Sequence, residues 1–291
     1  MTNPMDWMPL GDYEAFRNWS GQPRSWGPER AEWVAWDGGK IVDGPRKPGW
    51  KAWFGGKVVD GLCDELDQHM AAQRHPDSFP AAIGCVPWLT SEAVVDRLLK
   101  MACCVVLDKG AYLPARLVHS RLGFPNSAHP YLEEMTPAVD GDAMVVGPYT
   151  PREEMEHDLG PVRLLGWDGQ ASGKPLLHAK LLILGELSDV SYPDAPGLYC
   201  KRRFVAQRVW LGSANWTDRS RSHLEVGFLC DDPPLVARAT GFVTQVISFS
   251  EPVGTTCVGP EPNLVHVQYD EEAFNDAADL DSYCEDDDDD D

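Results

Sequence analysis

Apolar and polar positions follow the pattern of an α/β protein between about residues 79 and 250. Short apolar runs, each long enough for one buried strand, alternate with stretches whose apolar residues have helical spacing. The predicted strands are AAIGCVPWL, CCVVLDK, DAMVVG, PVRLLGW, LLHAKLLIL, RVWLGS and LEVGFLC. Helices are predicted after Ser91, near Ala111 to Arg121, from Pro151 through REEMEHD, and over Leu235 to Phe249. This alternation predicts an α/β fold with a mixed, mostly parallel sheet and helices on both faces.

The two ends of the chain lack this pattern. Residues 1–78 are rich in Gly, Pro and Trp and hold seven of the eleven tryptophans, with a short helix predicted over Val59 to Gln73. Such tryptophans favour a small module packed on a neighbouring domain over a base-stacking platform. We therefore predict a Trp-rich N-terminal region (1–78), a central domain (79–252) and an irregular C-terminal tail (253–291).

Charge separates the tail from the body. The net charge is −21, but residues 270–291 hold 13 acids and no Lys or Arg. The rest of the chain is only mildly acidic, with 33 acids against 25 bases. This composition predicts a disordered acidic tail, which solubilises the protein, competes with an anionic substrate, or docks on a basic protein partner. The acidic total also argues against a passive nucleic-acid coat protein, because such a protein carries a basic stripe.

The eight cysteines form no C-x-x-C pair, and several lie in apolar runs, most clearly Cys103 and Cys104. They are therefore predicted to be reduced core thiols rather than disulfides or zinc ligands. The N-terminal residues contain no apolar signal segment, and no stretch is apolar enough to cross a bilayer. We expect a cytoplasmic protein that has no membrane partner.

His178 and Lys180 lie two residues apart in LLHAKLLIL, so in a strand they share one face. A cation buried beside a histidine is costly unless an anion binds there. The alternative is a lysine that extends to water and a histidine capping the strand end.

A second polar group follows in VWLGSANWTDRSRSHLEVGF. Gly212 and Ser213 end an apolar run, Asn215 comes next, and Glu225 begins another predicted strand. A Gly-Ser turn with short polar side chains can donate hydrogen bonds to a phosphate, although these residues are also common in ordinary hairpin turns. If both strands end at one edge of the sheet, the two groups converge on one anion.

Together these residues resemble the phospholipase D superfamily, whose motif is written H-x-K-x4-D-x6-G-S-x-N. The match comprises His178, Lys180, Gly212, Ser213 and Asn215, with Glu225 in the family's acidic position, and the resemblance covers about residues 80–250. Gly185 occupies the position of the motif's aspartate. An insertion around Glu186 to Phe204, predicted to be an exposed loop, separates the two halves of the motif and carries Lys201, Arg202 and Arg203.

The resemblance implies a phospholipase D-like fold and metal-independent phosphodiester hydrolysis without a cofactor. His178 would form a phosphohistidine, Lys180 and Asn215 would stabilise the charge on phosphorus, and Glu225 would hold the histidine tautomer. Gly212, Ser213 and the Lys201–Arg203 run would bind phosphate. A second histidine must act as the acid, but the chain has one H-x-K, so a homodimer sharing the site is implied.

Three functions follow from this reading. The favoured one is a nuclease, since single-motif members of the family mostly act on nucleic acid. The alternatives are a phospholipase-type hydrolase and a non-catalytic interaction protein with a degenerate motif. The absence of an amphipathic anchor argues against the former, and retention of the bond-making residues argues against the latter.

Overall fold

A computed structural model describes residues 49–133, 135–137, 145–150, 158–168, 177–192 and 199–284. Three predicted features lie outside these ranges: the first five tryptophans, the acidic helix after Pro151, and the middle of the insertion (193–198).

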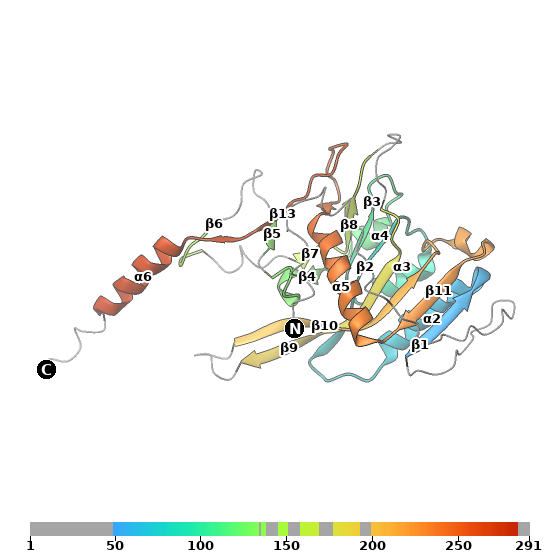
Figure 1. The fold of residues 1–291 in the computed structure, drawn as a ribbon, viewed down its shortest axis with the longest axis horizontal. Helices are drawn as coiled ribbons and strands as arrows, with labels where there is room; N and C mark the ends of the chain where they lie inside the picture. Colours follow the sequence, from blue (N-terminus) through green and yellow to red (C-terminus); the bar gives the residue numbers. More distant parts are fainter. Residues whose placement is uncertain are drawn as a thin grey trace.

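The described chain is organised around one eight-stranded sheet with the order β1-β11-β10-β9-β2-β3-β8-β12 (Figure 1). Its strands are β1 (Trp50–Phe54), β2 (Ser78–Val86), β3 (Ala102–Asp108), β8 (Val162–Leu165), β9 (Leu181–Tyr192), β10 (Tyr199–Gly212), β11 (Val226–Cys230) and β12 (Glu251–Pro252). The prediction of a mostly parallel sheet is wrong. Only β2–β3 and β3–β8 are parallel, and the other neighbours are antiparallel. Parallel neighbours need a crossover connection, whereas β9 and β10 pair with each other as an antiparallel hairpin.

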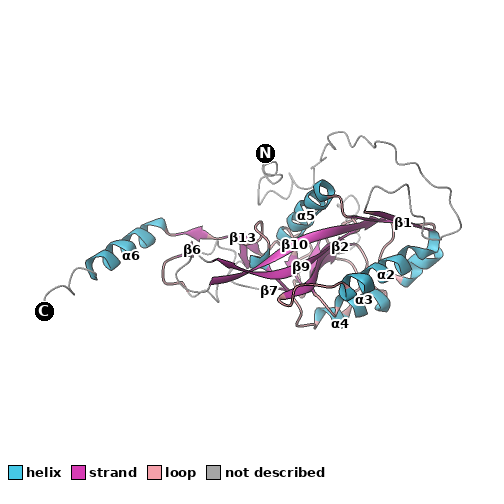
Figure 2. Cartoon of the chain, turned by 90° about the horizontal axis from the view of Figure 1, so that it is seen from below, coloured by secondary structure: helices cyan, strands magenta, loops and turns pink. Residues whose placement is uncertain are grey.

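Helices cover both faces of the sheet, as predicted. Figure 2 shows α2 (Val58–Ala71), α3 (Glu92–Leu98) and α4 (Ala115–Val118) on one side and α5 (Pro233–Ser248) on the other. Strand β9 illustrates why both faces are apolar: Leu182 and Leu184 join the cluster under α2 and α3, while Ile183 joins the cluster under α5. Alternate side chains of a strand point to opposite faces, so a central strand covered on both sides is apolar throughout.

The sheet extends further toward the N-terminus than the sequence predicted. The predicted helix at Val59 is α2, and the strand before it, β1, pairs with β11 along its full length. Trp53 of β1 is buried and packs against Trp210, with ring centroids 4.8 Å apart. Residues 50–71 therefore share the core of the domain that was predicted to begin at residue 79.

The insertion around Glu186 to Phe204 is not an exposed loop in its described parts. It continues β9 and β10 as a long hairpin, with Leu187 paired to Phe204 (Figure 1). Both side chains are buried, and the Phe204 ring meets Phe124 edge to face at 5.2 Å. These apolar contacts explain why the segment forms strands.

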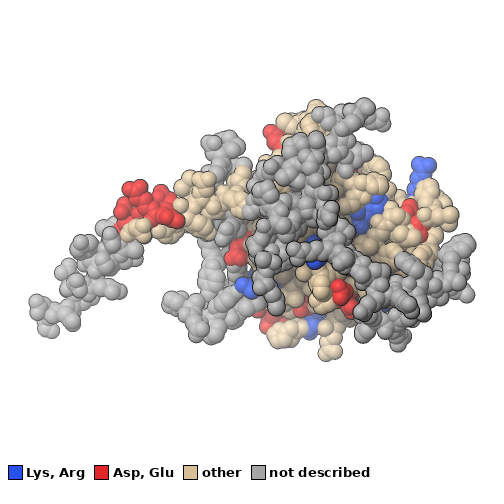
Figure 3. Space-filling view, in the orientation of Figure 1, with Lys and Arg blue, Asp and Glu red and all other residues tan. Residues whose placement is uncertain are grey.

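The C-terminal region is not wholly disordered. Its described part contains β13 (Leu264–His266), paired with β5 (Met135–Pro137), then β14 (Gln268–Tyr269), paired with β6 (Val145–Val146), and helix α6 (Glu271–Cys284). Asp270 caps α6, since its carboxylate accepts a hydrogen bond from Ala273 N at 3.0 Å. Figure 3 shows acidic side chains gathered on α6, which projects from the body. The predicted acidic segment is therefore partly a helix.

Shorter elements complete the described chain: η1 (Gly55–Lys57), β4 (Phe124–Pro125), η2 (Asn126–Ala128), β7 (Asp158–Leu159) and η4 (Asp218–Ser222). Cys103 and Cys104 are buried in β3, as predicted, and burial raises the pKa of the Cys104 thiol to about 12. Among the described residues, none of the helices has the length and apolar character needed to span a membrane.

Candidate active site

One end of the sheet gathers both halves of the predicted motif. Leu181, the first residue of β9, pairs with Leu211 of β10, and Gly212 pairs with Gly227 of β11. The start of β9, the end of β10 and the start of β11 therefore lie side by side. His178 and Lys180 precede β9, Ser213 and Asn215 follow β10, and Glu225 precedes β11. This juxtaposition depends on antiparallel pairing, because one strand of an antiparallel pair then ends at the edge of the sheet where its neighbour begins.

His178 and Lys180 lie just before the strand in which they were predicted, within an extended segment leading into β9. His178 is exposed, whereas Lys180 is only 6% exposed. The Lys180 ammonium donates a hydrogen bond to the His178 carbonyl oxygen at 2.9 Å. Burial lowers the pKa of Lys180, and the nearby Glu225 carboxylate opposes that shift. The segment thus combines an exposed histidine with a partly desolvated lysine two residues later.

Ser213 and Glu225 are joined to each other. The Ser213 hydroxyl donates to Glu225 Oε2 and accepts from Val226 N at 3.0 Å. Both residues belong to the strand ends that flank the site, so the contact ties β10 to β11. Among the contacts described, Glu225 reaches Ser213 rather than the His178 ring that it was predicted to orient.

The backbone N–H groups of the Gly-Ser turn are already used within the sheet. Gly212 N donates to Lys180 O at 3.3 Å, and Ser213 N donates to Val226 O at 2.9 Å. They therefore cannot also form the predicted phosphate cradle. Glycine is needed at position 212 for another reason, because an added Cβ would lie 2.5 Å from the carbonyl oxygen of Val226.

Asn215 carries an unused acceptor. Its Oδ1 atom is buried and has no hydrogen-bond partner among the described residues. The neighbouring Ala214 and Trp216 side chains are buried, and Trp216 N donates to Trp88 O at 3.1 Å, which fixes this part of the chain. A buried acceptor without a donor costs about 1–3 kcal/mol, so this position is suited to a bound donor.

The basic run lies elsewhere. Lys201, Arg202 and Arg203 are in the outer part of β10, about 30 Å along the strand from Gly212 at 3.3 Å per residue. Arg202 pairs with Asp189 at 2.9 Å and lies over the Phe79 ring. The prediction that this run lies beside the site is wrong, because the insertion extends the strands instead of folding back as a loop.

Asp108, at the end of β3, is a site residue that the sequence reasoning missed. Its carboxylate accepts hydrogen bonds from Leu177 N and Gly110 N, both at 3.1 Å, and the residue is 6% exposed. It therefore anchors the backbone next to His178. An acidic residue closing the apolar run CCVVLDK was the available signal, but its partner Leu177 is distant in sequence.

Replacing Asp108 by asparagine is expected to lower the predicted phosphodiester hydrolysis about 10- to 100-fold by releasing the His178 segment. An asparagine has one acceptor oxygen, so it cannot hold both N–H groups on separate oxygens as the carboxylate does. Overall stability should change little, because the variant also removes a buried charge.

The pH dependence of activity distinguishes a role of Asp108 in positioning His178 from a role in folding. Burial raises the pKa of Asp108 above its ordinary value of 3.8, against the lowering effect of its two N–H donors. The folded protein thus takes up this proton at higher pH than the unfolded chain, so protonation favours folding while it weakens the anchor. Activity should fall on acidification through this raised pKa, and kcat/KM profiles of the wild type and Asp108→Asn measure it. If Asp108→Asn keeps full activity and its kcat/KM falls at acidic pH just as the wild type's does, the positioning role of Asp108 is refuted.

No protein-family model and no curated protein sequence matches the chain. Among solved structures, the chain is similar to NucT from Helicobacter pylori, with 11% sequence identity and a TM-score of 0.39, over 70% of this chain and 98% of that one.

Proposed function

We propose that the protein is a metal-independent phosphodiesterase, and specifically a nuclease. The observation that carries this proposal is the meeting of His178, Lys180, Asn215 and Glu225 at one sheet end, from segments far apart in sequence. An exposed imidazole and a buried ammonium together suit attack on a phosphodiester, and the NH2 group of the Asn215 side chain can donate a hydrogen bond to a phosphoryl oxygen.

In the proposed reaction, a ring nitrogen of His178 attacks phosphorus and the bond to the leaving oxygen breaks. The Lys180 ammonium offsets the negative charge that builds on the phosphoryl oxygens. A second imidazole protonates the leaving alcohol, then removes a proton from the water that hydrolyses the phosphohistidine. The product is a phosphomonoester, and both imidazoles return to their starting states.

The second imidazole is proposed to be His178 of another copy of the chain. The sequence contains one H-x-K, and His119 and His129 lack the lysine two residues later. Two copies related by a two-fold axis would present two such residues to one phosphate.

The test is incubation of the purified full chain with labelled DNA, labelled RNA and a small phosphodiester ester, with and without EDTA. Cleavage of nucleic acid that persists in EDTA is the expected result. Activity that requires an added divalent cation would refute the metal-independent mechanism. If none of the substrates is hydrolysed, the proposed enzyme activity is wrong and the alternative, a non-catalytic interaction protein, takes its place.

A further inference from the structure

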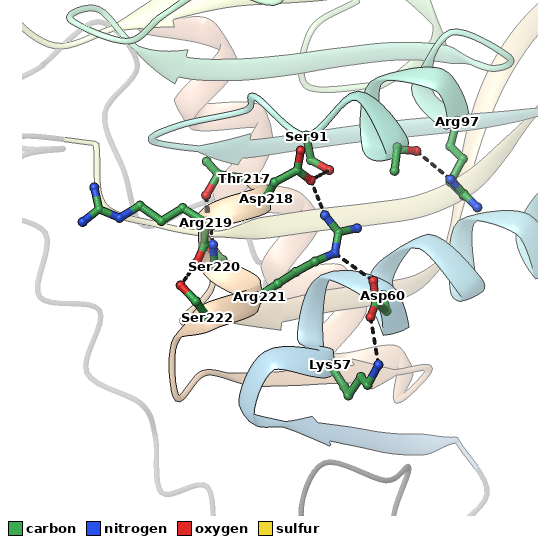
Figure 4. Close-up of polar contacts among 11 residues, drawn as sticks. Lys57, Asp60, Ser91, Arg97, Thr217, Asp218, Arg219, Ser220, Arg221 and Ser222 are labelled. Atoms are coloured by element: carbon green, nitrogen blue, oxygen red, sulfur yellow. Dashed lines mark hydrogen bonds and ion pairs between the residues drawn. The ribbon is translucent and has the colours of Figure 1, made fainter.

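The turn between Asn215 and Glu225 holds two arginines in different surroundings (Figure 4). Arg221 donates to Asp60 Oδ1 at 2.9 Å and also contacts Asp218. Asp218 in turn accepts a hydrogen bond from the Ser91 hydroxyl at 2.7 Å. The positive charge of Arg221 is thus matched by two carboxylates, and the turn is fastened to α2 and to the start of α3.

The backbone around Arg219 is fixed as well. Thr217 caps the turn, since its side-chain oxygen accepts from Ser220 N, and Ser220 is buried. The Ser222 hydroxyl donates to the Arg219 carbonyl oxygen at 2.8 Å. Arg219 therefore extends from a rigid turn rather than from a mobile loop.

The Arg219 guanidinium itself has no partner within the described parts of the chain, and the side chain is exposed. Figure 4 shows it pointing away from the network of Arg221, Asp218 and Asp60. It comes four residues after Asn215, a distance of at most about 14 Å along an extended chain. An uncompensated cation thus lies close to a site suited to an anion.

We infer that Arg219 binds a substrate phosphate that flanks the one being cleaved. This inference rests on the proposed function and specifies the substrate as a polyanion with successive phosphates. Guanidinium groups match phosphate oxygens in a bidentate geometry, and a rigid backbone reduces the entropy lost on binding. The Lys201–Arg203 run is too distant for this role.

The test compares Arg219→Ala with Arg121→Ala, a matched control. Arg121 is also exposed and has no partner among the described residues, but it lies near the start of β3, at the opposite end of the sheet. Each variant is measured with a labelled oligonucleotide and with a small ester that has a single phosphodiester.

Arg219→Ala should raise KM for the oligonucleotide about 5- to 10-fold with little change in kcat, and leave hydrolysis of the ester unchanged. The slope of log affinity against log salt should fall by about 0.7 to 0.9, the value for one phosphate contact. Arg219→Lys should restore part of the affinity, and Arg121→Ala should behave as the wild type.

The inference is overturned if Arg219→Ala and Arg121→Ala bind the oligonucleotide equally, or if Arg219→Ala impairs the ester to the same extent. Fluorescence anisotropy with the labelled oligonucleotide measures binding without cleavage. An inactive protein whose binding still depends on Arg219 would refute the proposed chemistry but support the contact, whereas a protein that does not bind would refute the contact.

Discussion

Replacing His178 by alanine is expected to lower phosphodiester hydrolysis by at least about 1,000-fold, because the proposed nucleophile and its two-fold copy are both lost. The fold should survive, since the ring is exposed and the described contact of this residue is made by its carbonyl oxygen. Stability should therefore stay within about 0.5 kcal/mol of the wild type. Initial rates on labelled nucleic acid, together with a urea unfolding curve, measure both quantities.

His75→Ala is the matched control for this variant. His75 is exposed and precedes β2, at the end of the sheet opposite the site, and it pairs only with the nearby Asp77 among the ion pairs described. It should retain wild-type activity in EDTA. Full activity in His178→Ala would remove this residue from the mechanism, and equal losses in both variants would indicate a general effect on folding.

Restoring the motif's aspartate by Gly185→Asp is expected to destabilise the protein by more than about 4 kcal/mol rather than to raise its activity. Gly185 is buried between β2 and β10, where an added Cβ would overlap the Val205 carbonyl oxygen and come within 2.7 Å of the Phe204 ring. Position 185 shares a strand face with Ile183 and Leu187, which belong to the apolar cluster under α5, so a new carboxylate there would be buried among apolar side chains.

Two further glycine variants separate the causes of this loss. Gly185→Ala adds only the Cβ and should cost about 1–3 kcal/mol from overpacking. Gly147→Ala should change the free energy of unfolding by less than about 0.5 kcal/mol, since a Cβ at Gly147 meets nothing within 4 Å. Denaturant unfolding of the three variants gives the comparison. A stable and more active Gly185→Asp protein would show that the missing aspartate limits the site.

Local patterns predicted the strands well but not their directions. Apolar runs such as the one ending at Leu184 indicate a buried strand whichever way its neighbours run. The direction of β9 and β10 was missed because the segment between Glu186 and Phe204, rich in proline and charge, was taken for a loop. Its inward positions, Leu187 and Phe204, become recognisable as core residues only in the folded protein, where they share an apolar cluster with Phe124.

The candidate site also combines features that local sequence patterns indicate with features that depend on contacts between distant segments. His178, Lys180 and Asn215 could be proposed from the sequence because their spacing within each segment is local. Asp108 could not, since its role comes from a hydrogen bond to Leu177 across 69 positions of sequence. The backbone N–H groups of Gly212 and Ser213 were misjudged for a related reason: whether a donor is free depends on the neighbouring strand.

The pairing of β1 with β11 also constrains how the polypeptide acquires its structure during synthesis. Trp50, near the start of the described chain, finds its ladder partner only when Cys230 has been made. Until then β1 lacks its neighbour in the sheet, and Leu229 of β11 is missing from the apolar cluster that contains Trp53 and the buried side of α2. Contacts of such long sequence separation slow folding and leave apolar surface open to association. Nascent chains stopped before β11 should therefore depend on chaperones, while release of the complete chain permits the sheet to close.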